Sequence, residues 1–241
     1  MEAPTPVDRR LILHAGGDIS SAVPEMLEHF RGVRRAVMIP YAVSDHDRVT
    51  DRLRDVLTPI ATDVIGLHTV ADPAGAVAAA DAIIVSGGNT FRLVRALHQL
   101  SLIEPVRAAV ARGVPYFGAS AGANVACPSL RTTNDMPIVQ PPSFTAFGLV
   151  PFQVNPHYID PPPPEARVGE TREERLREFL EENDVVVVAL REQSWLRIGT
   201  SAISLRGTAG AVLFRREAEP EQLQPGADLS YLLEETPRYD A

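Results

Sequence analysis

Short apolar runs alternate with amphipathic segments along the first half of the chain. The apolar runs predict buried strands, which we place at residues 10–14, 35–39, 63–67 and 82–85, and from 114 into Ser120. The segments between them have the periodicity of helices, which we place at residues 20–31, 45–60, 73–80, 91–100 and 104–112. Strands that alternate with helices form βαβ units with right-handed crossovers. We therefore predict an α/β fold with a largely parallel sheet.

The pattern changes after residue 126. Residues 127–164 carry many prolines and show few helical faces, and so long a loop region in a compact domain is usually either functional or disordered. A charged helix is expected at residues 170–182 and a buried strand at 184–190, followed by short strands with turns. No internal repeat or low-complexity linker interrupts the chain, so we predict a single domain over residues 1–241.

The composition is that of an ordinary soluble protein, with 45% hydrophobic and 22% charged residues. A net charge of −8 argues against nucleic acid or an anionic membrane surface as the main partner. The single cysteine, Cys127, excludes an intramolecular disulfide and a Cys-rich zinc site. No apolar run approaches the ~20 residues of a membrane helix, and the first residues lack the pattern of a signal peptide. We expect a soluble, cytoplasmic protein.

Ser120 stands between the fifth expected strand and an alanine-rich, helix-prone run, with Gly118 and Gly122 two residues to either side. This is the G-x-S-x-G pattern of a nucleophile elbow. A strand that turns abruptly into a helix leaves no room for side chains beside the turn. It also exposes the serine oxygen near the free N–H groups of the helix start. The alternative is a glycine-rich turn without chemistry, since such short patterns recur by chance.

His157 is the candidate base, because it follows Ser120 in a segment whose prolines restrict the backbone. We interpret the other histidines as surface or structural residues, and no H-E-x-x-H or comparable spacing indicates a metal hydrolase. Two acids compete to orient His157. Asp135 lies in the irregular segment between serine and histidine, whereas Glu192 follows the expected strand 184–190, where catalytic groups gather in α/β sheets. The residues alone leave both open.

The turn Gly87-Gly88-Asn89 follows the fourth expected strand. It lacks both G-x-G-x-x-G and a Gly-Lys-Ser/Thr ending, so a nucleotide site is not favoured. A serine hydrolase needs a second backbone N–H donor opposite the one that follows the nucleophile. A glycine turn on an adjacent strand offers such a donor, because no side chain blocks the approach.

Five motifs occur in order over nearly the whole chain: Ser86-Gly-Gly-Asn-Thr-Phe91, Gly118-Ala-Ser-Ala-Gly-Ala-Asn124, Thr133-Asn-Asp-Met-Pro-Ile138, Asn155-Pro-His-Tyr158 and Gly169-Glu-Thr-Arg-Glu173. Together they closely resemble the peptidase E, or α-aspartyl dipeptidase, family of serine peptidases, which also includes cyanophycinase. The resemblance implies a three-layer α/β sandwich related to the class I glutamine amidotransferases. It also implies Ser120 as nucleophile, His157 as base, and the backbone N–H groups of Gly88 and Ala121 as the oxyanion hole.

The resemblance allows either acid as the third catalytic residue, and of Asp135 and Glu192 we prefer Asp135. It implies that Arg172, together with Asn89, binds the aspartyl carboxylate of the substrate, because burying that charge unpaired is unfavourable. Two features depart from the family. Ala119 stands where we expect a bulkier aromatic residue in many relatives, and the loop at residues 159–165 is unusually rich in proline.

We therefore expect a cytoplasmic serine dipeptidase that hydrolyses Asp-Xaa dipeptides with a free N-terminal aspartate through an acyl-enzyme, without a metal or organic cofactor. Its expected partner is a small peptide, not nucleic acid or a membrane. The alternatives are a carboxypeptidase or cyanophycinase-like enzyme of the same fold and a non-catalytic member that binds peptides. A cysteine hydrolase is disfavoured because Cys127 lies within the expected helix, before Pro128. The sequence leaves the oligomeric state open, a homodimer included.

Overall fold

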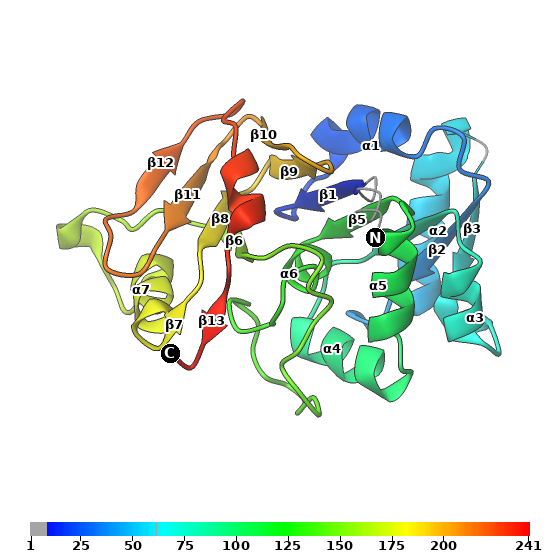
Figure 1. Cartoon of the computed structure of the whole chain (residues 1–241), viewed down its shortest axis with the longest axis horizontal. Helices are drawn as coiled ribbons and strands as arrows, with labels where there is room; N and C mark the ends of the chain where they lie inside the picture. Colours follow the sequence, from blue (N-terminus) through cyan, green and yellow to red (C-terminus); the bar gives the residue numbers. More distant parts are fainter. Residues whose placement is uncertain (1–8, 61) are drawn as a thin grey trace, which may run out of the picture.

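The computed structural model describes residues 9–60 and 62–241 (Figure 1). Residues 1–8, where no signal peptide is expected, lie outside the described residues. The larger sheet has seven strands in the order β10-β9-β1-β5-β4-β2-β3. Their bounds are Leu11–His14 (β1), Arg35–Ile39 (β2), Asp63–Gly66 (β3), Ala82–Val85 (β4), Tyr116–Ala119 (β5), Ser194–Ile198 (β9) and Ile203–Gly207 (β10). Strands β1 to β5 are parallel to one another, and the edge strand pair follows through β9, which is antiparallel to both β1 and β10.

A second sheet has four strands in the order β12-β11-β8-β6, and a two-stranded sheet pairs β13 with β7. The bounds are Gln153–Tyr158 (β6), Asn183–Asp184 (β7), Val187–Arg191 (β8), Ala211–Phe214 (β11), Glu221–Leu223 (β12) and Arg238–Tyr239 (β13). Strands β6 and β8 are parallel, whereas β11 is antiparallel to both β8 and β12. The short connection between β8 and β9 carries the chain from the second sheet back to the larger one.

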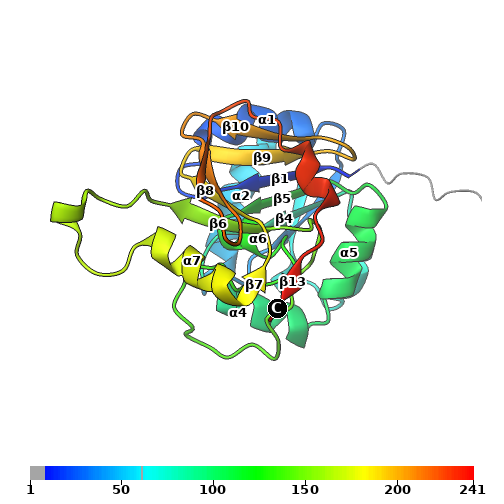
Figure 2. The ribbon, with the colours of Figure 1, turned by 60° about the vertical axis from the view of Figure 1, so that its left-hand side comes forward.

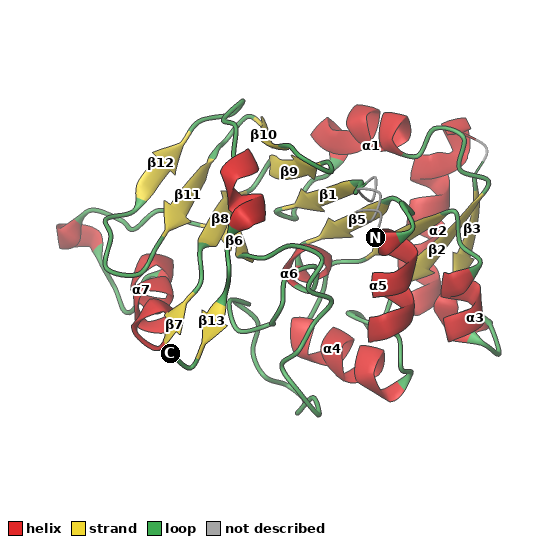
Figure 3. Cartoon of the chain, viewed as in Figure 1, coloured by secondary structure: helices red, strands yellow, loops and turns green. Residues whose placement is uncertain are grey.

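Helices cover both faces of the larger sheet (Figure 3). They are Val23–His29 (α1), His46–Leu57 (α2), Pro73–Ala78 (α3), Thr90–Gln99 (α4), Ile103–Ala111 (α5) and Ala121–Asn124 (α6). The remaining helix, Arg172–Glu182 (α7), packs on the second sheet. Helices α1 and α2 pack on one face, through a cluster that contains Met26, Leu57 and Phe117. Helices α3 to α6 pack on the other face, and their cluster continues into the second sheet.

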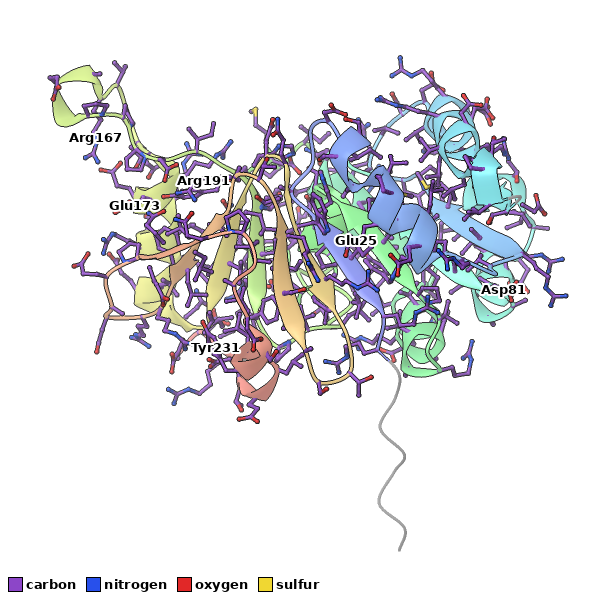
Figure 4. All side chains as sticks on the ribbon, turned by 90° about the horizontal axis from the view of Figure 1, so that it is seen from above. Glu25, Asp81, Arg167, Glu173, Arg191 and Tyr231 are labelled. Atoms are coloured by element: carbon purple, nitrogen blue, oxygen red, sulfur yellow. The ribbon has the colours of Figure 1, made fainter. Side chains whose placement is uncertain are left out.

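Glu25 on α1 ties this helix to the antiparallel edge of the sheet. Its carboxylate accepts a hydrogen bond from the Trp195 indole at 2.7 Å and one from Arg197 at 3.1 Å. Figure 4 shows Glu25 on the helix that covers these strands. These bonds connect α1 to β9, and Glu192 lies two residues before the start of this strand.

The expected α/β fold with a mostly parallel sheet is confirmed, and the expected strands and helices of the first half appear within a few residues of their limits. Two expectations were wrong. The proline-rich stretch, expected to be irregular, contains a strand, β6. This strand pairs with β8 both before and after a register shift between Asn155 and Tyr158. The expected strand 184–190 is split into β7 and β8, which pair with different partners.

The segment between β6 and α7 extends away from the body of the protein, as Figure 2 shows. Arg167 lies in this extension (Figure 4), and Val168 beside it is 95% exposed. Helix α7 itself is fixed by a capping box between Thr171 and Glu174 and packs on the second sheet through Leu176 and Leu180. No helix formed by residues 9–60 and 62–241 is long and apolar enough to cross a membrane.

Candidate active site

The candidate site lies where the carboxyl ends of strands from both sheets meet. Ser120 follows β5, the turn at Gly16 follows the neighbouring strand β1, and Gly87 follows β4 on the other side. From the second sheet, His157 lies in β6 and Glu192 follows β8. Parallel pairing places the ends of adjacent strands at one edge, so residues far apart in sequence are brought together.

Ser120 occupies a sharp turn between β5 and α6. Its backbone has φ 54° and ψ −111°, a conformation that a non-glycine residue rarely adopts. Close backbone contacts require glycine on both sides of the serine. A Cβ on Gly118 would lie 2.3 Å from the carbonyl oxygen of Gly122, and a Cβ on Gly122 would lie 2.4 Å from that of Val85. The Ser120 N–H donates to His14 O at 3.0 Å, which fixes the turn against β1.

His157 lies in β6, not in an irregular loop. The register of the β6–β8 pair shifts between Asn155 and Tyr158, and His157 has φ 55° at this irregularity. The bulge directs the imidazole toward β5. His157 Nε2 lies 2.9 Å from Ser120 Oγ, within hydrogen-bond distance.

Glu192 lies on the opposite side of the same imidazole. Its Oε1 is 3.0 Å from His157 Nδ1, and because a carboxylate only accepts, Nδ1 carries the proton. Nε2 is then free to accept the hydrogen bond of the Ser120 hydroxyl. The next residue, Gln193, has φ 65°, so Glu192 is presented by a tight turn between β8 and β9. The Glu192 side chain is 61% exposed.

Asp135, the acid that the sequence analysis preferred, has its hydrogen bonds within the described residues to Thr90 and Thr133 and not to His157. Its carboxylate accepts hydrogen bonds from Thr90 N and Thr90 Oγ1, both at 2.7 Å, and from Thr133 Oγ1 at 3.1 Å. These bonds hold the segment before β6 against the start of α4. The geometry thus places Glu192 beside the histidine and gives Asp135 a supporting position.

Two residues at the site escaped the sequence analysis. A Cβ on Gly16 would lie 2.5 Å from both Cε1 and Nε2 of His157, and one on Gly17 would lie 2.9 Å from Glu192 Oε2. Both glycines have positive φ, +106° and +71°. The Gly-Gly pair that follows β1 therefore makes room for the histidine and its acid. The sequence signal was present, since two glycines follow a buried strand.

His14 supports this turn from within β1. The buried ring accepts a hydrogen bond at Nδ1 from Gly16 N at 3.0 Å and stacks between Phe117 and Trp195. Burial, and secondly the nearby His157, lower the pKa of His14 to about 4. His14 is therefore neutral at physiological pH and acts as a fixed acceptor for the Gly16 turn.

The N–H groups of Gly88 and Ala121 lie on the turns that border Ser120. In the described part of the chain neither of them has a hydrogen-bond acceptor, whereas the neighbouring Asn89 N–H donates to Ala42 O at 2.8 Å. Gly88 has φ +135°, and a Cβ there would lie 2.5 Å from Ala42 O. The free N–H of Ala121 is the first of α6.

The two residues expected to bind substrate lie at the starts of two different helices, α4 and α7. The Asn89 side chain caps α4 by accepting from Arg92 N at 3.0 Å and donates to Met136 O at 2.9 Å. Arg172 begins α7 and lines a cavity of about 300 Å³ at the base of the extension. Its Nε is buried and has no partner among the described residues. Burial and Arg175 lower the pKa of Arg172, and the charge of Asp135 opposes this shift.

Cys127 is buried, and Val154 N–H donates to its sulfur at 3.1 Å. Burial raises the pKa of this thiol to about 12, so it is not a thiolate at neutral pH. Within residues 9–60 and 62–241, no three His, Cys, Asp or Glu side chains are grouped so that they could hold a metal ion.

Comparisons with known proteins show the family of the chain. The family model "Peptidase family S51" matches residues 11–206. Peptidase E of Streptomyces coelicolor is 51% identical over 94% of this chain and 93% of its own length. A probable alpha-aspartyl dipeptidase of Drosophila melanogaster is 44% identical over 92% of this chain and 94% of its own.

Among solved structures, a putative peptidase E protein from Listeria monocytogenes EGD-e superposes with a TM-score of 0.65 at 21% identity, over 84% of this chain and all of that one. A peptidase from an acI-B1 actinobacterium superposes with a TM-score of 0.62 at 18% identity, over 93% and 98% of the two chains. These structures share the fold. The chain belongs to peptidase family S51.

Proposed function

We propose that this protein is a serine dipeptidase that hydrolyses Asp-Xaa dipeptides with a free N-terminal aspartate. The observation that carries the proposal is the hydrogen-bonded series from Ser120 Oγ to His157 Nε2 and from His157 Nδ1 to Glu192 Oε1. A nucleophile, a base and an acid that orients the base occur in this order in serine hydrolases on several unrelated folds. Two relatives carry the names peptidase E and probable alpha-aspartyl dipeptidase, which supports the same substrate class.

In the first step the Ser120 oxygen attacks the scissile carbonyl carbon while its proton passes to His157 Nε2. Glu192 stabilises the imidazolium that forms and keeps the ring in the tautomer with its proton on Nδ1. The geometry needs little rearrangement, because the oxygen and nitrogen are already 2.9 Å apart.

We assign the oxyanion hole to the backbone N–H groups of Gly88 and Ala121. Two donors fixed by tight turns stabilise charge that develops only in the transition state. Losing one such donor typically lowers the rate by about 10²–10³-fold. We further infer that the Ser120 turn is a nucleophile elbow and that the fold is a three-layer sandwich of the class I glutamine amidotransferase type. The backbone of Ser120 and the helices on both faces of the sheet support this.

His157 then donates its proton to the leaving amine, which departs as the amino acid Xaa. A water molecule, deprotonated by His157, attacks the aspartyl-enzyme ester and releases aspartate. The overall reaction consumes one water and needs no redox step. No step in this sequence calls on a metal or organic cofactor.

We propose Arg172 and Asn89 as the groups that recognise the aspartyl substrate. The Arg172 Nε is a buried donor that has no partner among the residues that the structure describes, so a substrate carboxylate would satisfy it. The amide nitrogen of Asn89 has two N–H donors, and the bond to Met136 O uses one of them. We retain the cytoplasm as the expected location, on the composition alone.

The test is hydrolysis of Asp-Leu, Leu-Asp and Asp-Leu-Leu by the wild-type protein and by Ser120→Ala. We expect only Asp-Leu to be cleaved and Ser120→Ala to be inactive. Cleavage of the other two peptides that depends on Ser120 would keep the mechanism but would indicate a different specificity, such as that of a carboxypeptidase. A wild-type protein that cleaves none of them and resists a serine-directed phosphonylating reagent would contradict the proposal and favour a peptide-binding protein.

A further inference from the structure

A cavity of about 380 Å³ opens directly beside Ser120, on the face of the larger sheet that α1 and α2 cover. Its rim is formed by Ser120 and by the glycine turns at Gly16 and Gly87. Its walls are apolar side chains of strands and of helix α2, among them Met38, Leu53, Val56, Ile84 and Phe117. Pockets of this size and lining are typical of small-ligand sites.

The small side chain of Ala119 leaves space in the cavity next to Ser120. Alternate residues of a strand point to the same face, so Ala119 and Phe117 of β5 both face the α1–α2 side, and both line the cavity. Ala119 is the last residue of β5, immediately before the nucleophile. A longer side chain at this position would extend into the space that is now open, next to the Ser120 oxygen.

We propose that this cavity is a subsite for the side chain of the leaving residue and that it selects a large apolar Xaa. This inference rests on the proposed dipeptidase function. Gly16 shows that the cavity lies on the His157 side of Ser120, because this glycine lines the cavity and also contacts the His157 ring. His157 must protonate the leaving amine, so the residue that carries this amine lies on the His157 side of Ser120.

The groups assigned to the aspartyl residue are absent from this cavity. Neither Asn89 nor Arg172 belongs to its described lining. The cavity and the aspartyl-binding groups are therefore separate, as the two residues of a dipeptide require.

The charges near the cavity argue for an apolar occupant. Its charged lining residues among those described are Asp18 and Arg52, and both are exposed. The two oxygens of Asp18 accept hydrogen bonds from Ser20 N and Ser20 Oγ. A polar or charged side chain placed deeper would be surrounded by aliphatic and aromatic groups without a partner, which is unfavourable.

The experiment compares kcat/KM for Asp-Gly, Asp-Asn and Asp-Leu, where asparagine and leucine have similar shape but opposite polarity. We expect the wild-type protein to prefer Asp-Leu to the other two by about tenfold or more, since apolar groups in such pockets discriminate to this extent. Ala119→Leu fills the cavity beside the nucleophile and Val56→Phe fills it from α2, away from the catalytic turn. Both variants should lose the preference for Asp-Leu, measured within each variant as the ratio of kcat/KM for Asp-Leu to kcat/KM for Asp-Gly. Val168→Phe, an exposed change on the extension, is the matched control.

A second readout separates the subsite from the catalytic function. Saturation-transfer NMR on the wild-type protein should detect binding of free leucine but not of glycine, and Val56→Phe should abolish the leucine signal. Leucine binding without hydrolysis of any Asp-Xaa peptide would contradict the proposed function and retain the subsite. Equal kcat/KM values for the three peptides, or an unchanged preference in both cavity-filling variants, would overturn the subsite and leave the dipeptidase function standing.

Discussion

Gly16 lies in direct contact with the imidazole of His157. A Cβ atom at this glycine would lie 2.5 Å from His157 Cε1 and Nε2, and 2.9 Å from the Cβ of Ser120. A side chain at residue 16 would therefore displace either the histidine or the turn. Gly16, in the turn after β1, thus restricts the position of the His157 ring, although it takes no part in the chemistry.

Gly16→Ala should therefore inactivate the enzyme without unfolding it. Displacing a catalytic group by about 1 Å commonly costs 10²-fold in rate, and we expect kcat for Asp-Leu to fall by at least about that factor. The matched control is Gly32→Ala. Gly32 also has positive φ (+80°), but no atom lies within 4 Å of a Cβ there. The control should lose about 1–3 kcal/mol of stability from backbone strain and keep its kcat. Full activity of Gly16→Ala would contradict the assigned role of the turn.

Glu192→Gln should lower kcat by about 10²-fold or more, because the amide stabilises neither the imidazolium nor the required tautomer as the carboxylate does. KM should change little, since Glu192 has no assigned contact with substrate. Asp135→Asn provides the comparison. It weakens charge-assisted bonds to Thr90 and should mainly reduce the free energy of unfolding, by about 1–3 kcal/mol. The reverse pattern, with Asp135→Asn the more damaging to kcat, would restore Asp135 as the orienting acid.

Local pattern and motif spacing were enough to predict the parallel sheet, its helices and the Ser120 turn. They were not enough to predict β6, because a proline-rich run has no local strand signal and its pairing with β8 is a long-range contact. For the same reason, the sequence did not predict that Glu192, rather than Asp135, lies within hydrogen-bond distance of His157. Which acid reaches His157 depends on the register of β6 against β8, and one residue of register moves a side chain to the other face.

Cys127 should be inert toward iodoacetamide in the folded protein. Its thiol is buried and its pKa is raised to about 12, so little thiolate is present at pH 7.5. Mass spectrometry of the reagent-treated native protein should show no carboxamidomethyl group, and the urea-unfolded protein should show one. Modification of the native protein with loss of activity would support the alternative hypothesis that the protein is a cysteine hydrolase.

Acid should destabilise the fold through two buried histidines. Burial lowers the pKa of His14 to about 4 and that of His29 to about 3, with further contributions from His157 and Arg10 respectively. In the unfolded chain both titrate near 6.5. As the pH falls below 6.5 the unfolded chain takes up protons that the folded chain does not, so the free energy of unfolding decreases with falling pH. Each histidine should lower the free energy of unfolding by on the order of 2–3 kcal/mol between pH 7 and pH 4.

Urea titrations between pH 7 and pH 4 measure this loss. His29→Gln is the diagnostic variant, because its amide N–H can replace the ring N–H that lies 3.2 Å from Tyr116 O, and glutamine does not titrate. The variant should lose less stability than the wild type over this range. An identical pH dependence in the two proteins would show that His29 is not responsible.

Arg172→Ala should remove the preference for aspartate. Truncating one partner of a buried charge pair costs about 2 kcal/mol or more, so kcat/KM for Asp-Leu should fall by about 30-fold or more. Activity on Asn-Leu, which has no charge to lose, should change far less, so the ratio of the two rates is the measurement. Arg177→Ala is the matched control, since Arg177 on the same helix is not among the described residues that line the cavity at Arg172, pairs with exposed Glu219 at 3.0 Å and should leave the ratio unchanged. An unaltered preference in Arg172→Ala would place the aspartyl carboxylate elsewhere, with the second N–H of Asn89 as the remaining donor.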